Sequence, residues 1–169
     1  MNAESKTHSS TLIKIQTAFV CLVPAALVTG PFLSDLFCII SSLLFLYTSL
    51  RLKLFKYYLN APVYIFLFFC FIFILISLLS SNPKLSLESS LFYFRFGLFA
   101  LSIWYLLEVN HLFLKQFSII LTITLFIVLI DAYIQFSTGS NILGFKYNGT
   151  RVSGFFNEEL KLGMYLAHF

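Results

Sequence analysis

The segment PVYIFLFFCFIFILISLLS, from Pro62 to Ser80, decides the fold because it contains no charged residue. A helix that rises about 1.5 Å per residue over this range crosses the roughly 30 Å hydrocarbon core of a bilayer. The whole sequence is similar in character, with 59% hydrophobic residues, 11% charged residues and a mean hydropathy of +0.91. A soluble core of this size could not bury its 22 phenylalanines and 9 tyrosines. We therefore predict an all-α fold, a polytopic bundle of transmembrane helices.

Polar and helix-breaking residues divide the chain into about five complete spans and the start of a sixth. The expected spans are approximately 15–33, 36–50, 62–80, 91–107 and 117–134. Pro24 is expected to kink the first span, and Gly30-Pro31 is expected to end or bend it. A short turn at Ser34-Asp35 is expected to lead to the second span. An alternative is one broken helix over both spans. The serine-rich segment 81–90, with Asn82-Pro83, is predicted to be a loop.

The domain organisation follows from these spans. Residues 1–14 form a polar N-terminal tail, and residues 15–134 hold the five spans with short loops. Residues 135–157 form a longer polar loop. The last segment, 158–169, is apolar but too short to cross a bilayer, so we expect a sixth span cut in its middle and a chain that is a fragment.

The positions of the basic residues predict the orientation of the spans. With the N-terminus inside, the cytoplasmic basic residues are Lys6, Lys14, Arg51, Lys53, Lys56 and Lys115, and the external ones are Lys84, Lys146, Arg151 and Lys161. The excess of basic residues inside favours this orientation. The loop 135–157 then lies on the external face, which is the periplasm in a bacterium.

Composition and spacing exclude several function classes. The basic residues form no stripe, so the net charge of +4 does not indicate binding to nucleic acid. The three cysteines (Cys21, Cys38 and Cys70) lie in apolar runs without a CxxC or Cys/His pattern. We therefore predict no metal site and no cofactor.

Two intramembrane charges are candidates for function. Arg95 is expected about one turn into the fourth span, either extending to the headgroups or facing a cavity between helices. Asp131, near the end of the fifth span, is a candidate counter-ion for Arg95, and Asp131 and Gln135 share one helix face because they are four residues apart. A structural Arg–Asp pair is an equally economical interpretation.

The loop 135–157 contains further local signals. Asn148-Gly149 favours a tight hairpin turn that would place Arg151 on a defined face. Asn157 is a candidate N-cap of the last helix, with Glu158 and Glu159 in its first turn. Glu158 is either part of this cap or a base or acceptor for a sugar hydroxyl.

One pattern in this region resembles a known family. The residues are Asp131…Gln135…Gly139…Gly144…Arg151-x-Ser153-Gly154-x-Phe156-Asn157…Gly163-x-Tyr165-Leu166, and the pattern is similar to the membrane-embedded O-antigen ligase and O-antigen polymerase family. The resemblance covers the last quarter of the chain in motif and the rest only in hydropathy. Members of that family carry a later large periplasmic loop with further essential residues, which this sequence lacks.

The resemblance implies an inner-membrane glycosyltransferase that works on the periplasmic side without a metal. It implies a polyprenyl-diphosphate-linked glycan as donor, and a lipid A core or another glycan as acceptor. Arg151 would be the catalytic cation on the diphosphate, with Arg95, Ser153, Gly154 and Glu158 as further substrate-binding residues. Asp131, Gln135 and Asn157 would give structural support.

Other interpretations of these residues remain open. Arg151 could instead bind lipid phosphate at the interface. The chain could also be part of a transporter or flippase with Arg95 and Asp131 along a pathway, or a non-catalytic membrane fragment. A transporter predicts internal repeats, and the spans show no convincing repeat.

Overall fold

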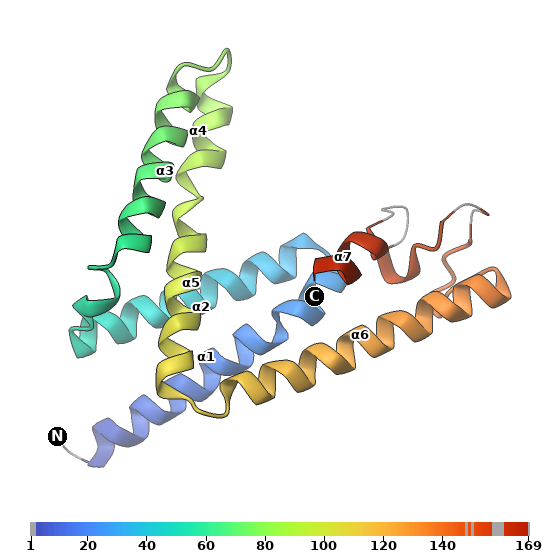
Figure 1. The fold of residues 1–169 in the computed structure, drawn as a ribbon, viewed down its shortest axis with the longest axis horizontal. Helices are drawn as coiled ribbons and strands as arrows, with labels where there is room; N and C mark the ends of the chain where they lie inside the picture. Colours follow the sequence, from blue (N-terminus) through green and yellow to red (C-terminus); the bar gives the residue numbers. More distant parts are fainter. Residues whose placement is uncertain (1–2, 148, 150, 157–160, 169) are drawn as a thin grey trace. The chain divides into compact units, whose positions relative to one another are not determined.

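The computed structural model describes residues 3–147, 149, 151–156 and 161–168. Its helices are α1 (Ala3–Thr29), α2 (Pro31–Leu52), α3 (Ala61–Leu78), α4 (Pro83–Leu91), α5 (Phe94–Val109), α6 (Phe113–Thr138) and α7 (Leu162–His168), with 3₁₀ turns η1 (Phe55–Tyr57) and η2 (Gly154–Phe156) (Figure 1). Within the described residues there is no β-strand, only one isolated antiparallel bridge between Ser140 and Lys146. The prediction of an all-α fold is confirmed.

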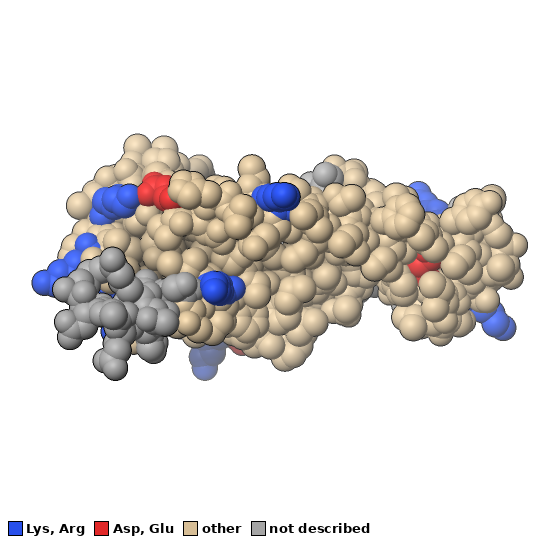
Figure 2. All heavy atoms as spheres, turned by 90° about the horizontal axis from the view of Figure 1, so that it is seen from below, with Lys and Arg blue, Asp and Glu red and all other residues tan. Residues whose placement is uncertain are grey.

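Five helical segments are long and apolar enough to cross a membrane, as predicted. They are Thr11–Thr29, Pro31–Leu52, Ala61–Leu78, Pro83–Val109 and Phe113–Thr138. Large apolar side chains cover the outside of these helices; in α3, for example, Ile65, Phe68 and Ile76 are all more than half exposed. The face shown in Figure 2 is mostly uncharged, with Lys and Arg in isolated positions. Such a surface needs an apolar solvent, so the chain is a multi-pass membrane protein.

The chain divides into two compact units, which we describe separately. The first unit comprises Met1–Val20 and Cys38–Phe113, and the second comprises Cys21–Phe37 and Leu114–Phe169. The first contains α3, α4 and α5 in full, and the second contains α7 and nearly all of α6. Helices α1 and α2 contribute residues to both units.

The first two spans separate at Gly30, where the sequence predicted an end or a bend, and not at Ser34-Asp35, where it predicted a turn. Gly30 has a φ of 132°, a conformation that residues with a Cβ rarely adopt, and Pro31 begins α2. Ser34 and Asp35 lie inside α2, where the Ser34 hydroxyl donates a hydrogen bond to the Pro31 carbonyl (2.9 Å). Because the Ser34 hydroxyl has its hydrogen-bond partner within its own helical turn, the helix continues through Ser34 and Asp35 and the expected turn is absent.

The predicted loop 81–90 is largely helical, because its serines find partners within a helical hairpin. Pro83 begins α4 directly after the turn, and α3 and α4 lie side by side in Figure 1. The Ser77 hydroxyl of α3 donates to the Ser90 hydroxyl of α4 (2.9 Å), and the Ser86 hydroxyl donates to that of Ser80 (3.0 Å). The fourth span is therefore longer than predicted and begins at Pro83.

This longer span changes the position of Arg95, which lies twelve residues (95 − 83) after Pro83, or about 18 Å along the helix. Arg95 is therefore near the middle of its span and not one turn from its end. The helix is interrupted just before it, at Phe92 and Tyr93, where the amides of Tyr93, Arg95 and Phe96 bond to carbonyls three residues back. The Arg95 guanidinium lies 4.8 Å from the centre of the Phe96 ring.

Aromatic residues hold the core of the first unit together. Phe45 of α2 is fully buried and packs against the rings of Tyr57, Tyr58 and Tyr105 at centroid distances of 5.8–6.1 Å. Polar bonds join other helices of this unit: the Gln16 amide of α1 donates to the Ser102 hydroxyl of α5 (2.6 Å). The core thus fixes the α2–α3 connection against α5.

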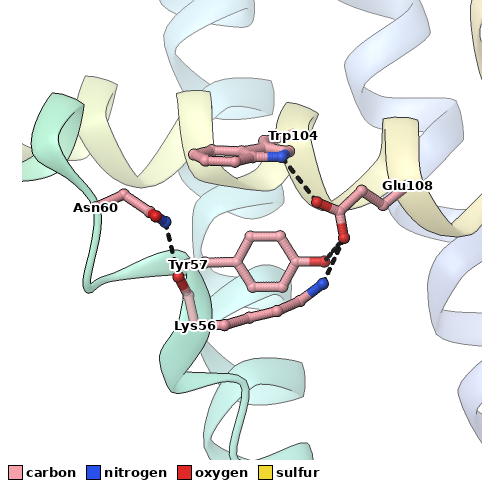
Figure 3. Close-up of polar contacts among 5 residues, drawn as sticks. All are labelled: Lys56, Tyr57, Asn60, Trp104 and Glu108. Atoms are coloured by element: carbon pink, nitrogen blue, oxygen red, sulfur yellow. Dashed lines mark hydrogen bonds and ion pairs between the residues drawn. The ribbon is translucent and has the colours of Figure 1, made fainter.

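A polar cluster fastens this connection to the end of α5 (Figure 3). The Glu108 carboxylate accepts hydrogen bonds from Lys56 Nζ (2.5 Å), Tyr57 OH (2.8 Å) and Trp104 Nε1 (2.9 Å). The hydrogen bond to Glu108 raises the pKa of Lys56, and burial, followed by the hydrogen bond to Glu108, raises the pKa of Tyr57.

The raised pKa values predict an alkaline transition at this cluster. Both Lys56 and Tyr57 are protonated more readily in the folded chain, so the cluster stabilises the fold below pH 10.0–10.5, their ordinary pKa values. This contribution is lost as the pH rises through the raised values. The fluorescence of Trp104, the single tryptophan, should stay constant from neutral pH to about 10 and change above it. A change that begins near pH 8 would contradict this assignment.

Lys53 ends α2 in an unusual conformation. Its φ is 52°, in the left-handed region, and the Leu54 amide bonds back to the Ser49 carbonyl (3.0 Å), as in the glycine-terminated ends of many helices. For a residue with a Cβ, this conformation costs about 1–2 kcal/mol, more than the roughly 0.5–1 kcal/mol that glycine costs through its chain entropy.

Replacing Lys53 with glycine should therefore stabilise the fold. We expect Lys53→Gly to raise the midpoint of thermal unfolding in detergent by about 2 °C, for a net gain of about 0.5–1 kcal/mol. Leu52→Gly, one residue earlier and inside α2, is the matched control and should lower the midpoint. A lower midpoint in Lys53→Gly would contradict the proposed cost of the left-handed backbone.

Candidate functional site

The polar residues of the motif region gather around the last two turns of α6. Asp131 and Gln135 lie on one face of α6, and both side chains are fully buried although they belong to a membrane-spanning helix. The loop that follows α6 folds back over this face. Both side chains bond directly to that loop, so they determine where Arg151 and its neighbours lie.

Gln135 uses all of its hydrogen-bonding capacity on the loop. Its Oε1 accepts from the backbone amides of Ser153 (2.9 Å) and Gly154 (2.8 Å). Its Nε2 donates to the Ser153 hydroxyl (3.1 Å) and to the Phe145 carbonyl (3.2 Å). One amide side chain thus satisfies two donors and two acceptors. Because Gln135 joins two separate parts of the loop, it fixes the Ser153-Gly154 step relative to α6.

Asp131 binds the first part of the same loop with Asn141. The Asp131 carboxylate accepts hydrogen bonds from the Ile142 amide (3.1 Å) and from Asn141 Nδ2 (3.3 Å). Asn141 Nδ2 also donates to the Gly154 carbonyl (3.0 Å), and its Oδ1 accepts from the amides of Leu143 and Phe145. Asn141 therefore joins Asp131 to Gly154 and closes the network.

Asn141 was missed by the sequence analysis, although a signal was present. Asn141 follows Gly139 and Ser140 directly after α6, and an asparagine at such a place commonly accepts a bond from the amide two residues later. The Leu143 amide makes this bond (3.1 Å). The side chain is 5% exposed, which shows that it is part of the interior of the loop.

Gly154 is required where the loop comes closest to Asp131. Its φ is 55°, and a Cβ added there would lie 3.3 Å from Asp131 Oδ2. Both the backbone conformation and the short distance disfavour a side chain at this position. The Ser153-Gly154 pair predicted as a substrate-binding element is thus buried against α6, and its backbone donors point to Gln135.

The basic residues of the loop are exposed, in contrast to the buried Ser153-Gly154 pair. Arg151 and Lys146 are exposed, while Ser153, two residues after Arg151, is 6% exposed. The hairpin predicted around Asn148-Gly149 falls partly outside the described residues, because Asn148 is not described. The turn that the structure describes lies earlier, at Asn141–Gly144, where Asn141 and Phe145 pair and the Tyr147 amide bonds to the Gly139 carbonyl.

The last helix completes the second unit. Leu162 and Tyr165 of α7 pack on Val128 of α6, and the rings of Phe156 and Tyr165 are 5.4 Å apart. The Tyr165 hydroxyl donates to the Pro24 carbonyl of α1 (2.8 Å). Six residues of the motif pattern therefore meet within one unit: Asp131, Gln135, Ser153, Gly154, Phe156 and Tyr165.

Three further candidates lie outside the described residues or in the other unit. Asn157 and Glu158, the predicted cap and base, lie outside the described residues. Arg95 belongs to the first unit, and in the second unit the Asp131 carboxylate accepts hydrogen bonds from the two loop donors given above. Within the described residues, no group of three or more His, Cys, Asp or Glu side chains is arranged to hold a metal ion.

Comparisons with known proteins give no relative for this chain. No family model, characterised protein or solved structure matches it.

The Gln135 network predicts a local loss of order when it is broken. Gln135→Leu leaves the Ser153 and Gly154 amides and the Ser153 hydroxyl without the Gln135 side chain, while the Phe145 carbonyl keeps its bond from the Asn141 amide. Each unsatisfied buried group costs about 1–3 kcal/mol, so hydrogen exchange at the two amides should accelerate by at least about tenfold. Gln116→Leu, at an exposed position near the start of α6, is the matched control. Unchanged exchange in Gln135→Leu would show that the loop is held by other contacts.

Proposed function

We propose that this chain belongs to an inner-membrane glycosyltransferase of the O-antigen ligase or polymerase type. The observation that carries the proposal is that Arg151 is exposed and stands two residues before a backbone step that Gln135 holds. Its neighbours Ser153 and Gly154 are bonded to Gln135, while the guanidinium belongs to an exposed residue at the end of a membrane span. A cation held in this way suits a diphosphate at the membrane surface.

The chemistry of the proposed reaction explains why a fixed cation is useful. In the transfer, the bond between the sugar carbon and the diphosphate oxygen breaks, and a bond from that carbon to an acceptor hydroxyl oxygen forms. Negative charge develops on the departing polyprenyl diphosphate, and the acceptor hydroxyl gives its proton to a base. Arg151 would stabilise the departing charge more than the ground state, because it is already positioned by the loop. Glu158 is the proposed base or hydroxyl acceptor.

The proposed orientation places this loop in the periplasm of a bacterium, with the N-terminus in the cytoplasm. Its support is the distribution of basic residues around the five spans. The exposed Lys146 is a suitable position for an accessibility label in this loop, whereas Ser153 is buried and would not react. Lys146→Cys, in a background without the three native cysteines, should react with a membrane-impermeant thiol reagent in cells with a permeabilised outer membrane. Reaction only after lysis of the inner membrane would contradict the proposal.

Binding of a polyprenyl diphosphate tests the role of Arg151. Loss of one charge-assisted contact costs about 1.5–3 kcal/mol, so Arg151→Ala in reconstituted vesicles should bind about 10–100-fold more weakly. Lys146→Ala removes an exposed cation from the same loop and is the matched control, with an expected change of less than about threefold. Equal losses in both variants would indicate non-specific attraction to the charge of the loop.

A second candidate function, transport or lipid flipping, is favoured by the interrupted helix at Arg95. A broken helix with an arginine in mid-span is typical of substrate pathways through membranes. The two candidates separate in the same binding assay. If Arg95→Gln abolishes binding of the diphosphate and Arg151→Ala leaves it unchanged, the transport function is supported and the transferase proposal fails.

A further inference from the structure

An apolar groove of about 470 Å³ lies between α3 and α5 in the first unit. Residues of α5 along one face of that helix, from Phe94 through Gly97 and Leu101 to Trp104, line one side, and the first turns of α3 line the other. A Cβ on Gly97 would overlap the Phe66 ring, so the glycine lets this ring approach the α5 backbone. The groove therefore depends on a close contact between two spans.

The length of the groove matches one leaflet of a bilayer. Phe94 and Trp104 are ten residues apart (104 − 94), or about 15 Å along α5, which is half of the roughly 30 Å hydrocarbon core. The lining is almost entirely apolar, and both helices are membrane spans. A groove in this position is filled by the hydrocarbon chain of a lipid.

Polar groups gather at one end of the groove only. Trp104 lines the groove and donates its Nε1 to Glu108, and Tyr58 lines it at the same end (Figure 3 shows the Trp104–Glu108 contact). The Tyr58 hydroxyl is buried and, within the described part of the chain, has no hydrogen-bond partner. Protein atoms already cover this hydroxyl, so it is not a contact for a ligand in the groove.

The basic residues in the segment before α3 favour a lipid with an anionic headgroup. The α2–α3 connection carries Arg51, Lys53 and Lys56, all on exposed residues. Lys56 bonds to Glu108, and the exposed residues Arg51 and Lys53 carry the other two positive charges of this segment. Lys53 has a left-handed backbone conformation that glycine would adopt more easily. Residues in such unfavourable conformations cluster at functional sites.

We propose that the groove between α3 and α5 binds an anionic glycerophospholipid. One acyl chain lies along α5 from Trp104 toward Phe94, and the phosphate lies near Arg51 and Lys53. The site is in the first unit and is independent of the Arg151 loop, so it stands whether or not the chain transfers glycans.

Trp104 reports on this site directly, because it is the single tryptophan of the chain. The full chain is reconstituted in phosphatidylcholine vesicles that contain a small fraction of lipid brominated in one acyl chain. Brominated phosphatidylglycerol should quench Trp104 at least about threefold more than brominated phosphatidylcholine at the same fraction, because two nearby cations attract the anionic lipid. Equal quenching by the two lipids would overturn the proposal.

Two variants test the separate parts of the site, and a third is a control. Ala100→Leu fills the groove and should reduce the preferential quenching to the level of phosphatidylcholine, whereas Ala167→Leu on α7 should leave it unchanged. The Arg51→Gln/Lys53→Gln double variant should abolish the preference, with Lys115→Gln as its control. Tyr58→Phe should leave the preferential quenching unchanged, because protein atoms cover the hydroxyl that it removes. An unchanged preference in both Ala100→Leu and the double variant would show that no lipid occupies this groove.

Discussion

The requirement that every buried polar group have a partner shapes both units of this chain. In hydrocarbon, water cannot satisfy an exposed backbone amide or carbonyl. A loop packed against a span, such as 139–147, meets the same requirement wherever the protein excludes water. Gln135, Asp131 and Asn141 bond to the loop after α6, and all three are buried.

The same requirement explains why hydroxyl-rich segments are helical here. Ser42, Thr48, Ser90 and Thr124 donate their hydroxyl protons to carbonyls four residues earlier, at 2.7–2.9 Å. A serine that bonds within its own helix does not compete with the helix for the backbone. Serine-rich stretches that would form loops in water therefore remain in the spans, and α4 is the clearest example.

The sequence was sufficient for the features that depend on hydropathy and much weaker for those that depend on contacts. The apolar runs predicted five spans, because length and the absence of charge are properties of the segment alone. The end or bend at Gly30-Pro31 was predicted, whereas the helical state of Ser34-Asp35 and the helix α4 were not, since both depend on where particular hydroxyl and backbone groups find partners. The pairing of Gln135 with residues 18 and 19 positions later could not be read from spacing, although the shared face of Asp131 and Gln135 could. Asn141 had a local signal, whereas the groove beside Trp104 had none, because it depends on the contact between Gly97 and Phe66.

The bond between Tyr165 and Pro24 also sets an order on the synthesis of the protein. The two residues are 141 positions apart, so the Pro24 carbonyl has no Tyr165 partner until the residues between them have been synthesised. At about 5–20 residues per second, the delay is roughly 7–28 s. During that time the Pro24 region is held in the membrane by its own hydrophobicity and by the helices made after it. The second unit is therefore assembled only after α7 has been made, although its first residues belong to α1.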